Sequence, residues 1–256
     1  MKIGIIGRGT VGDAVYHGLA QVGNVMSHYD IKDGSCINDI FDTEIVFVCV
    51  PTDATFDGRC DVSIVDDVVQ KLYEIKYPGI ISIKSTVIPG TTDRFIKKFA
   101  DLNLCCVPEF LRQKSAYSDF FDNHDVLVIG THNQAMSDKI IKAHRFIPKS
   151  ISVVSPVEAE VVKYFNNVHN AMDIVFANTM YEMCTKLGAD YQEVLSALAK
   201  RENINAAYLK CSDSYKGYQG HCLPKDTAAW QMLSKDLKVD VLLFRSIIKD
   251  NERYTK

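Results

Sequence analysis

The sequence has no long apolar run, no strong excess of one charge and no Cys-x-x-Cys pair. Its 256 residues are 47% hydrophobic and 24% charged, with a formal net charge of −3, which excludes a disordered chain and gives no sign of a nucleic-acid partner. No stretch reaches the roughly 18 consecutive apolar residues that a membrane-spanning helix needs. Internal repeats and low-complexity tracts are also absent. The length suits one large domain or two modest ones.

The eight cysteines include no Cys-x-x-Cys pair. No metal site is therefore expected, and a disulfide framework is not expected in a chain of this size. The N-terminus enters a strand pattern directly and does not read as a signal peptide. These features fit a cytoplasmic protein with reduced thiols, one of which is a candidate nucleophile.

The longest periodic segment runs from Pro156 to about Gly188 without an internal proline or glycine. Its apolar residues recur every three or four positions over roughly nine turns, about 48 Å. Ser155 is a candidate N-cap. A helix of this length predicts a link between two lobes or a subunit interface. Lys163 and Asn167 lie on one face of it, either as a solvated pair or as part of a site.

Residues 1–150 alternate between strand and helix patterns. Strands are expected at 2–6, 25–30, 43–50, 79–86, 104–107 and 125–130. Nearly continuous apolar runs such as 43–50 fit strands covered on both faces, so we expect a parallel, doubly wound α/β sheet of the Rossmann type. After residue 150 the strand patterns stop, and helices are expected at 156–188, 190–200, 226–236 and 239–252. The predicted domains are 1–155, which would bind a dinucleotide, and 156–256, which would be helical.

The first strand leads at once into Gly7-Arg8-Gly9-Thr10-Val11-Gly12, and the second strand ends on Asp30. Between a strand and a helix, such glycines let a pyrophosphate approach the helix N-terminus. Asp30 is placed to take the ribose 2′-hydroxyl, which favours NAD over NADP. The alternative is a purely structural glycine turn.

Other candidate segments follow later strands at their carboxyl ends, where ligands collect in open α/β sheets. Val50-Pro51-Thr52 and Ser85-Thr86 are expected beside the cofactor, with ordinary loop capping as the alternative for Ser85 and Thr86. In the second half, Cys222 stands shortly before a helix expected near Asp226. The positive end of a helix and neighbouring lysines favour a thiolate, so Cys222 is a candidate reactive thiol; a buried structural cysteine is the alternative.

Together these stretches resemble the UDP-glucose/GDP-mannose dehydrogenase family, most closely its short bacterial UDP-glucose 6-dehydrogenases. The resembling segments occur in the family's order and are the glycines at 7, 9 and 12, Val50-Pro51-Thr52, Ser85-Thr86-Val87 with Pro89-Gly90-Thr91, PEFLR at 108–112, AEVVKYFNN at 159–167 and CLPKDT at 222–227. The resemblance reaches Asn251-Glu252-Arg253, the close of the family's central helical domain. The family's C-terminal nucleotide-binding domain has no counterpart in this sequence.

The resemblance implies a four-electron, NAD-dependent oxidation of the C6 alcohol of a nucleotide sugar such as UDP-glucose. Cys222 would carry the aldehyde as a thiohemiacetal and then a thioester. Lys163 and Asn167 would position a water and stabilise oxyanions. Asp226 would assist proton removal, Glu109 would activate water, and Thr86 would line the site near the nicotinamide. The candidate substrate contacts are Glu109, Phe110, Leu111, Lys163, Asn167, Tyr208 and Gly217.

Some positions depart from the family pattern. Gln219 stands where short bacterial members usually have a glycine, and Gln113-Lys114 stands where they have Glu-Gly. Asp173 and Thr179 replace a common lysine and glutamate on the long helix. The resemblance also implies a homodimer through the 156–188 helix, and the alternative is that later helices cover its apolar face within one chain.

Two other functions remain open. One is a two-electron NAD-dependent dehydrogenase of a small hydroxy acid or sugar alcohol, because β-hydroxyacid and 6-phosphogluconate dehydrogenases share a glycine-rich sheet, a long helix and a Lys-x-x-x-Asn spacing. Cys222 argues against it, since such enzymes need no thiol nucleophile. The other is a non-catalytic NAD-binding partner subunit, suggested by the absent C-terminal domain and the altered loop.

Overall fold

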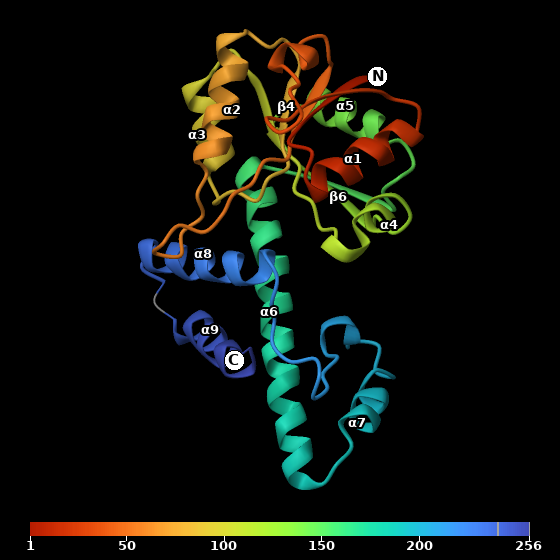
Figure 1. The fold of residues 1–256 in the computed structure, drawn as a ribbon, viewed down its shortest axis with the longest axis vertical. Coiled ribbons are helices and arrows are strands. Elements are labelled where there is room, and N and C mark those ends of the chain that lie inside the picture. Colours follow the sequence, from red (N-terminus) through yellow and green to blue (C-terminus); the bar gives the residue numbers. More distant parts are fainter. Residues whose placement is uncertain (240, 256) are drawn as a thin grey trace. The chain divides into compact units, whose positions relative to one another are not determined.

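A computed structural model describes residues 1–239 and 241–255, and strands alternate with helices up to residue 154 (Figure 1). The strands are β1 (Lys2–Ile6), β2 (Val25–Tyr29), β3 (Ile45–Val48), β4 (Ile80–Ile83), β5 (Asn103–Cys106), β6 (Val126–Gly130) and β7 (Ser150–Val154). The α-helices are α1 (Thr10–Gln21), α2 (Ser63–Glu74), α3 (Thr91–Lys98), α4 (Ala116–Phe121), α5 (Gln134–His144), α6 (Pro156–Leu187), α7 (Tyr191–Leu198), α8 (Cys222–Asp236) and α9 (Leu242–Tyr254).

The chain divides into two compact units. The first holds residues 1–53 and 61–163, and the second holds residues 54–60 and 164–256. The first two turns of α6 thus group with the sheet, because Ala159 packs against Gly130 at the end of β6. The domain boundary at 155/156 that the sequence suggests stays a prediction.

In the described residues, seven strands form one sheet in the order β2-β1-β3-β4-β5-β6-β7. The expected doubly wound α/β fold is confirmed. The expectation of a wholly parallel sheet is wrong at one pair, because β5 and β6 are antiparallel, joined at Cys106 and Gly130. The connection between these strands, residues 107–125, holds a short 3₁₀ helix, Gln113–Ser115, and the six-residue α4, whose Phe120 is buried in one core with α1.

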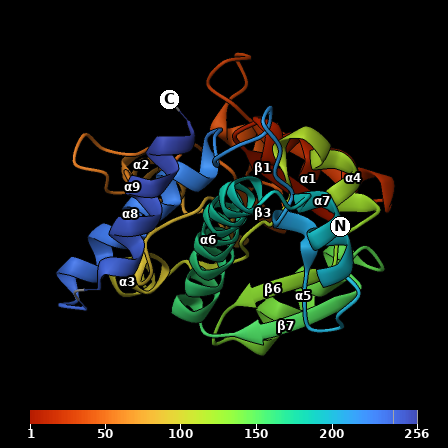
Figure 2. The same cartoon turned by 90° about the horizontal axis from the view of Figure 1, so that it is seen from below.

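The sequence did not predict β7, which pairs in parallel with β6 at the edge of the sheet (Figure 2). Ile151 and Val153 of this strand are 43% and 45% exposed. An edge strand is covered on fewer sides than a central one, so its short sequence lacks the continuous apolar run of a buried strand.

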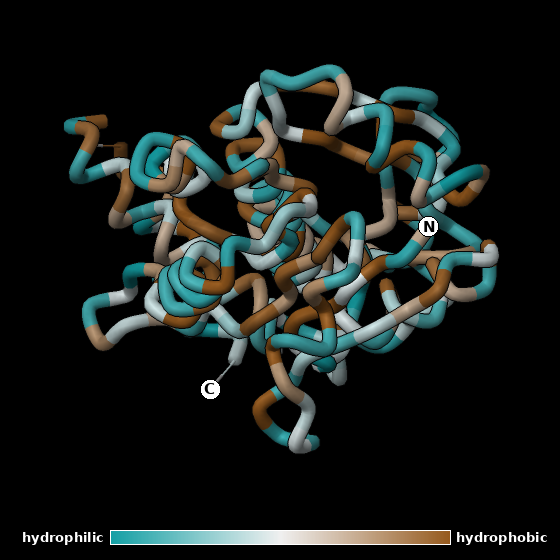
Figure 3. Tube along the Cα trace, turned by 90° about the horizontal axis from the view of Figure 1, so that it is seen from above, coloured by the Kyte–Doolittle hydropathy of each residue, from teal (hydrophilic) through white to brown (hydrophobic). Residues whose placement is uncertain are grey.

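Both faces of the sheet are covered, as its apolar strands require. Successive residues of a strand point to opposite faces, so Ile45 and Phe47 of β3 join a core with α1, α4 and α5. Val46 and Val48 join a second core with α2 and α3. Hydrophobic segments, brown in Figure 3, alternate along the chain with hydrophilic ones, the pattern expected of buried strands and amphipathic helices.

The second unit is helical and is built on α6. Tyr191 of α7 packs with Ala177 of α6, and Ile247 of α9 packs with Ile174 of α6. The helix expected near residue 226 starts earlier, at Cys222, since a proline is tolerated in the first turn of a helix. No helix in the described ranges combines the length and apolarity that crossing a membrane requires.

Candidate functional site

The order of the strands reverses between β1 and β3, and ligands of open α/β sheets bind outside the carboxyl ends of strands at such a point. The loops after these two strands meet there. Gly7 has φ of 90°, and a Cβ at this position would lie 2.8 Å from the carbonyl oxygen of Cys49. Gly7 is therefore required both for its backbone conformation and for the close approach of the two loops.

The glycine loop leaves the N-terminus of α1 open. A Cβ on Gly12 would lie 1.9 Å from the carbonyl oxygen of Gly7, so the helix packs tightly on the loop, whereas nothing lies within 4 Å of a Cβ at Gly9. Gly9 is the N-cap of α1, and the first N–H groups of a helix, those of Thr10 and Val11 here, lack intrahelical acceptors. The open space over these donors fits the pyrophosphate of a dinucleotide.

Asp30 lies beside this loop, directly after β2, with its carboxylate fixed by backbone donors. Its oxygens accept the N–H groups of Arg8 at 2.7 Å and Lys32 at 2.9 Å. The Arg8 guanidinium bonds Asp13 at 2.5 Å and lies 3.9 Å from the centre of the Tyr16 ring, so it is engaged with α1. A fixed carboxylate at this place fits the ribose of NAD.

The hydroxyl groups predicted beside the cofactor join two loops at the carboxyl edge of the sheet. Thr52 Oγ1 donates to the carbonyl oxygen of Thr86, and Ser85 Oγ donates to that of Val50, both at 2.7 Å. The loop that contains Pro51 is thus held against the end of β4. This bond agrees with ordinary loop capping, the alternative for Ser85 and Thr86, and cofactor contacts of both residues stay a prediction.

Glu109 is 7% exposed and forms an ion pair that sequence reasoning missed. Nζ of Lys84, the residue after β4, donates to Glu109 Oε2 at 2.9 Å and to the Val107 carbonyl oxygen at 3.3 Å. Burial raises the pKa of Glu109, but Lys84 and hydrogen bonds more than offset it, so the pKa lies below its ordinary value. The feature of the sequence that could have indicated this ion pair is a lysine directly after the apolar strand IISI.

The first unit brings further predicted residues next to Glu109. The N–H of Phe110 donates to Glu109 Oε1 at 3.0 Å, and Lys163 Nζ lies 5.5 Å from the centre of the Phe110 ring. Leu111 packs partly buried against the core under α1. Glu109, Phe110 and Lys163 therefore form one cluster in which a cation faces an aromatic ring.

Glu160 of α6 is a second buried carboxylate that was not predicted. It is 2% exposed and accepts the N–H groups of Gly90 at 2.5 Å and Thr92 at 2.8 Å, as well as the Thr92 hydroxyl at 2.7 Å. These donors surround the N-terminus of α3, where a carboxylate is favoured. The Pro89-Gly90-Thr91 and Ala159-Glu160 segments of the family pattern thus pack on each other.

In the second unit, Asn167 and Asp226 are brought together and are buried, with exposures of 5% and 1%. Asn167 Nδ2 donates to Asp226 Oδ2 at 2.6 Å, and Lys225 Nζ donates to Oδ1 at 2.6 Å. A solvated position for Asn167, weighed above as an alternative, does not hold. Lys225 completes this cluster and was missed as a partner, because only the fold places it on the carboxylate.

Cys222 is the first residue of α8, so its thiol lies at the positive end of that helix. Asp226 follows four residues later on the same face. Of the eight cysteines, all within the described ranges, Cys36 and Cys222 are exposed. Cys222 is therefore not a buried structural cysteine.

The loop before Cys222 accommodates its departures from the family pattern. Gly217 and Gly220 have φ of 67° and 81°, whereas among the described non-glycine residues a positive φ occurs at Lys76, Arg145 and Lys238. Gln219 therefore has an ordinary backbone and does not strain the loop. A Cβ on Gly217 would lie 2.5 Å from Thr255, and Tyr208 packs partly buried against the core of α6 and α9. Substrate contacts for Tyr208 and Gly217 stay a prediction.

The fold and the glycine loop define a dinucleotide-binding α/β protein with a helical second unit. Comparison with known families is more specific. Residues 32–147 match the NAD binding domain of the UDP-glucose/GDP-mannose dehydrogenase family, and residues 157–253 match its central domain. The chain belongs to this family, and it contains the family's NAD-binding domain.

Individual relatives agree with this assignment. A UDP-glucose 6-dehydrogenase of Rickettsia bellii is 30% identical over 236 residues, covering 89% of this chain and 54% of the relative. A putative UDP-glucose 6-dehydrogenase of Bacillus subtilis, YtcA, is 29% identical over 98% of this chain and 68% of the relative. The solved UDP-glucose dehydrogenase of Pyrobaculum islandicum superposes with a TM-score of 0.89 at 25% identity, covering 98% of this chain and 68% of that one. The chain thus spans about half the length of the Rickettsia protein.

Proposed function

We propose that this chain acts in an NAD-dependent, four-electron oxidation of the C6 alcohol of a nucleotide sugar, of which UDP-glucose is the first candidate. The observation that carries the proposal is the arrangement on α8. An exposed thiol, Cys222, begins the helix, and a buried carboxylate, Asp226, lies four residues later with Asn167 and Lys225 as its donors. Thiol and carboxylate on one helical face suit covalent catalysis combined with proton transfer.

The roles of the side chains follow from their chemistry. NAD, when bound, would supply the hydride acceptor for each of the two oxidations. Asp226 would assist removal of the alcohol proton, and the Cys222 sulfur would add to the aldehyde to give a thiohemiacetal, whose oxidation leaves a thioester. Lys163 and Asn167, on one face of α6, would stabilise the oxyanions. Glu109 would accept a proton from the water that hydrolyses the thioester.

The product ratio tests this proposal against its alternatives. With limiting UDP-glucose and excess NAD, two NADH per sugar are expected, and Cys222→Ser should abolish acid formation. The matched control is Cys36→Ser, which removes the other exposed thiol and should leave the ratio at two. One NADH per sugar with unchanged Cys222→Ser turnover would instead support the two-electron dehydrogenase. NAD binding without turnover on a panel of nucleotide sugars would support the non-catalytic subunit.

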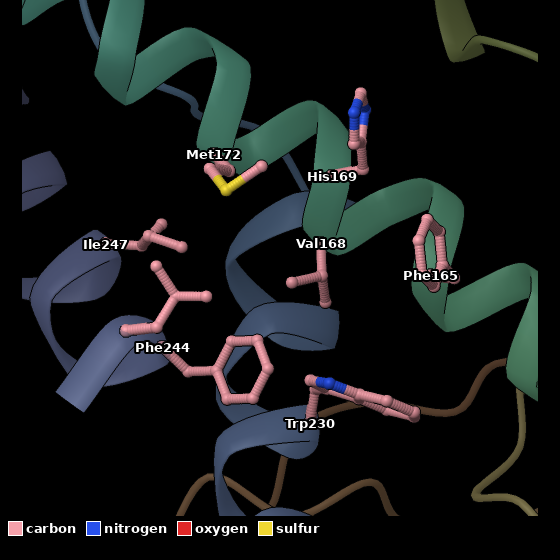
Figure 4. A pocket seen from close by; sticks show the side chains of 8 residues that line it. Phe165, Val168, His169, Met172, Trp230, Phe244 and Ile247 are labelled. Atoms are coloured by element: carbon pink, nitrogen blue, oxygen red, sulfur yellow. The ribbon is translucent and has the colours of Figure 1, made fainter. Parts of the chain in front are cut away.

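We also propose that the chain forms a homodimer through α6. Apolar side chains along this helix stay uncovered by its own chain: Phe165, Phe176, Met183 and Leu187 are 65%, 54%, 50% and 78% exposed. Phe165 also lines an apolar pocket of about 280 Å³ within the second unit (Figure 4), together with Val168, His169, Met172, Trp230, Leu243, Phe244 and Ile247. Exposed apolar surface of this kind marks an interaction site. In a symmetric dimer, a two-fold axis would pack these exposed side chains of α6 against the same side chains of the second copy.

A further inference from the structure

Lys84 is a lysine with no solvent exposure of its side chain. Lysine is almost never fully buried unless it is paired, and here it follows directly on the apolar strand β4. Its Nζ lies 5.7 Å from the centre of the Phe47 ring and 5.9 Å from that of Phe120. Its polar partners are the Val107 carbonyl oxygen and the Glu109 carboxylate. The cation thus stands in an aromatic setting and points its donors at the segment after β5.

A need for stability does not account for this pair. Removing two charges from water is expensive, and replacing a buried ion pair by apolar residues of similar volume is often neutral or stabilising. The pair does hold the Glu109 carboxylate in its charged form and in one orientation. Lys84 holds Oε2, and the Phe110 N–H holds Oε1 at 3.0 Å. Both oxygens of Glu109 are therefore oriented by donors.

Besides Lys84, His124 lowers the pKa of Glu109, but it contributes less than Lys84 does, and only when its ring is protonated. Burial lowers the pKa of His124 and lowers that of His144 to about 3, so both rings are neutral at neutral pH. Burial raises the pKa of the Cys49 thiol to about 12, so this group is also uncharged. Lys84 is accordingly the cation that faces Glu109 from the end of β4.

We propose that Lys84 is a positioning residue, which keeps Glu109 ionised and oriented so that it can accept a proton from the hydrolytic water. The inference rests on the proposed function, in which Glu109 activates that water. As Glu109 takes the proton, the hydroxide adds to the thioester carbonyl carbon, the C–S bond breaks and Cys222 leaves as a thiolate; the proton on Glu109 then passes to solvent. Without Lys84, a buried carboxyl would hold its own proton and could not take one.

The first test needs no enzymatic activity, so its failure is distinct from failure of the proposed function. Protein labelled with ¹³C at glutamate carboxyl carbons is titrated by NMR, and the signal lost in Glu109→Gln is assigned to Glu109. In the unsubstituted protein the Glu109 carboxyl should stay ionised until the pH falls below the ordinary pKa range of glutamate. In Lys84→Met the midpoint of its titration should rise by at least one pH unit, which is a tenfold change in its proton affinity. Lys71→Met, the same change on the exposed surface of α2, should shift nothing. An unchanged Glu109 titration in Lys84→Met overturns the proposal.

The second test uses turnover. The acid limb of the kcat–pH profile should move to higher pH in Lys84→Met, with activity regained at alkaline pH and the sugar KM within about twofold. A purely structural role would lower kcat at every pH without moving that limb, and this result would overturn the proposal.

A third variant covers failure of Lys84→Met to fold. The double variant Lys84→Met/Glu109→Gln has no charge at either position, so it should fold even where Lys84→Met does not, and where both fold its unfolding midpoint should exceed that of Lys84→Met. If adding Glu109→Gln to Lys84→Met gives no gain in stability, the two side chains are not coupled and the proposal fails.

Discussion

The hydrogen bonds that the buried carboxylate of Glu160 accepts allow a prediction of how much it contributes to the stability of the fold. Glu160→Ala removes the acceptor of three donors, the N–H groups of Gly90 and Thr92 and the Thr92 hydroxyl. A hydrogen bond to a charged group contributes about 1.5–3 kcal/mol, and a buried donor left without a partner costs about 1–3 kcal/mol. Water entering the emptied space would pair some of these donors, and removal of a buried carboxylate returns part of its desolvation cost.

The expected net loss is therefore about 3 kcal/mol, smaller than the sum over three bonds. In a chain of this size each kcal/mol shifts Tm by about 2–4 °C, so Glu160→Ala should lower the melting point of the first unit by about 6–12 °C. Glu160→Gln keeps one acceptor oxygen and should cost only about 1–2 kcal/mol.

The assay must report on the correct unit. The single tryptophan, Trp230, lies in the second unit, so its fluorescence is unsuitable. Hydrogen exchange of the Thr92 amide reports on α3 directly, and circular dichroism during urea unfolding gives the loss of free energy of unfolding for the whole chain. Glu182→Ala is the matched control, since Glu182 lies on the same helix and makes only a long ion pair of 3.6 Å with Arg253. Such exposed pairs contribute about 0–1 kcal/mol. A loss of less than about 0.5 kcal/mol in Glu160→Ala, with Thr92 exchange unchanged, would refute the reasoning.

Two further predictions concern the cofactor and the oligomer. Asp30→Ala should weaken NAD binding and reduce the preference for NAD over NADP, because it removes the carboxylate that would pair the ribose 2′-hydroxyl and repel a 2′-phosphate. Titration of the protein with each nucleotide measures both dissociation constants. If the unsubstituted protein binds NADP as tightly as NAD, the role proposed for Asp30 is contradicted. For the dimer, light scattering at micromolar concentration should give a mass near 57 kDa, twice the 28.7 kDa of the chain. Phe176→Glu on α6 should return a 28.7 kDa species, while Phe146→Glu, at a side chain 76% exposed in the first unit, should not; an unsubstituted protein of 28.7 kDa would exclude the dimer.

Features that depend on neighbouring residues were readable from the sequence. The glycine loop, Asp30 and the long helix follow from local geometry, since a glycine with positive φ and a sustained 3.6-residue period need only nearby chain. The central strands were predicted for the same reason, because burial on both faces leaves a continuous apolar run. Prediction failed where the pattern in the sequence was weak. The strand β7 was not predicted, because it is a half-exposed edge strand. The start of α8 was placed too late, because a proline follows soon after its first residue, Cys222.

The partners of the buried charges were decided by tertiary structure alone. Lys84 meets Glu109 across 25 positions, Glu160 meets Thr92 across 68, and Asn167 meets Asp226 across 59. A sequence shows that such groups exist, but not which donor faces which acceptor, because the packing of whole elements sets that pairing. A buried charge is tolerated only where its partner is brought within hydrogen-bond distance. The sequence therefore identified candidate site residues such as Glu109 and Asp226, whereas the fold determined the donors, such as Lys84 and Asn167, that hold their carboxylates.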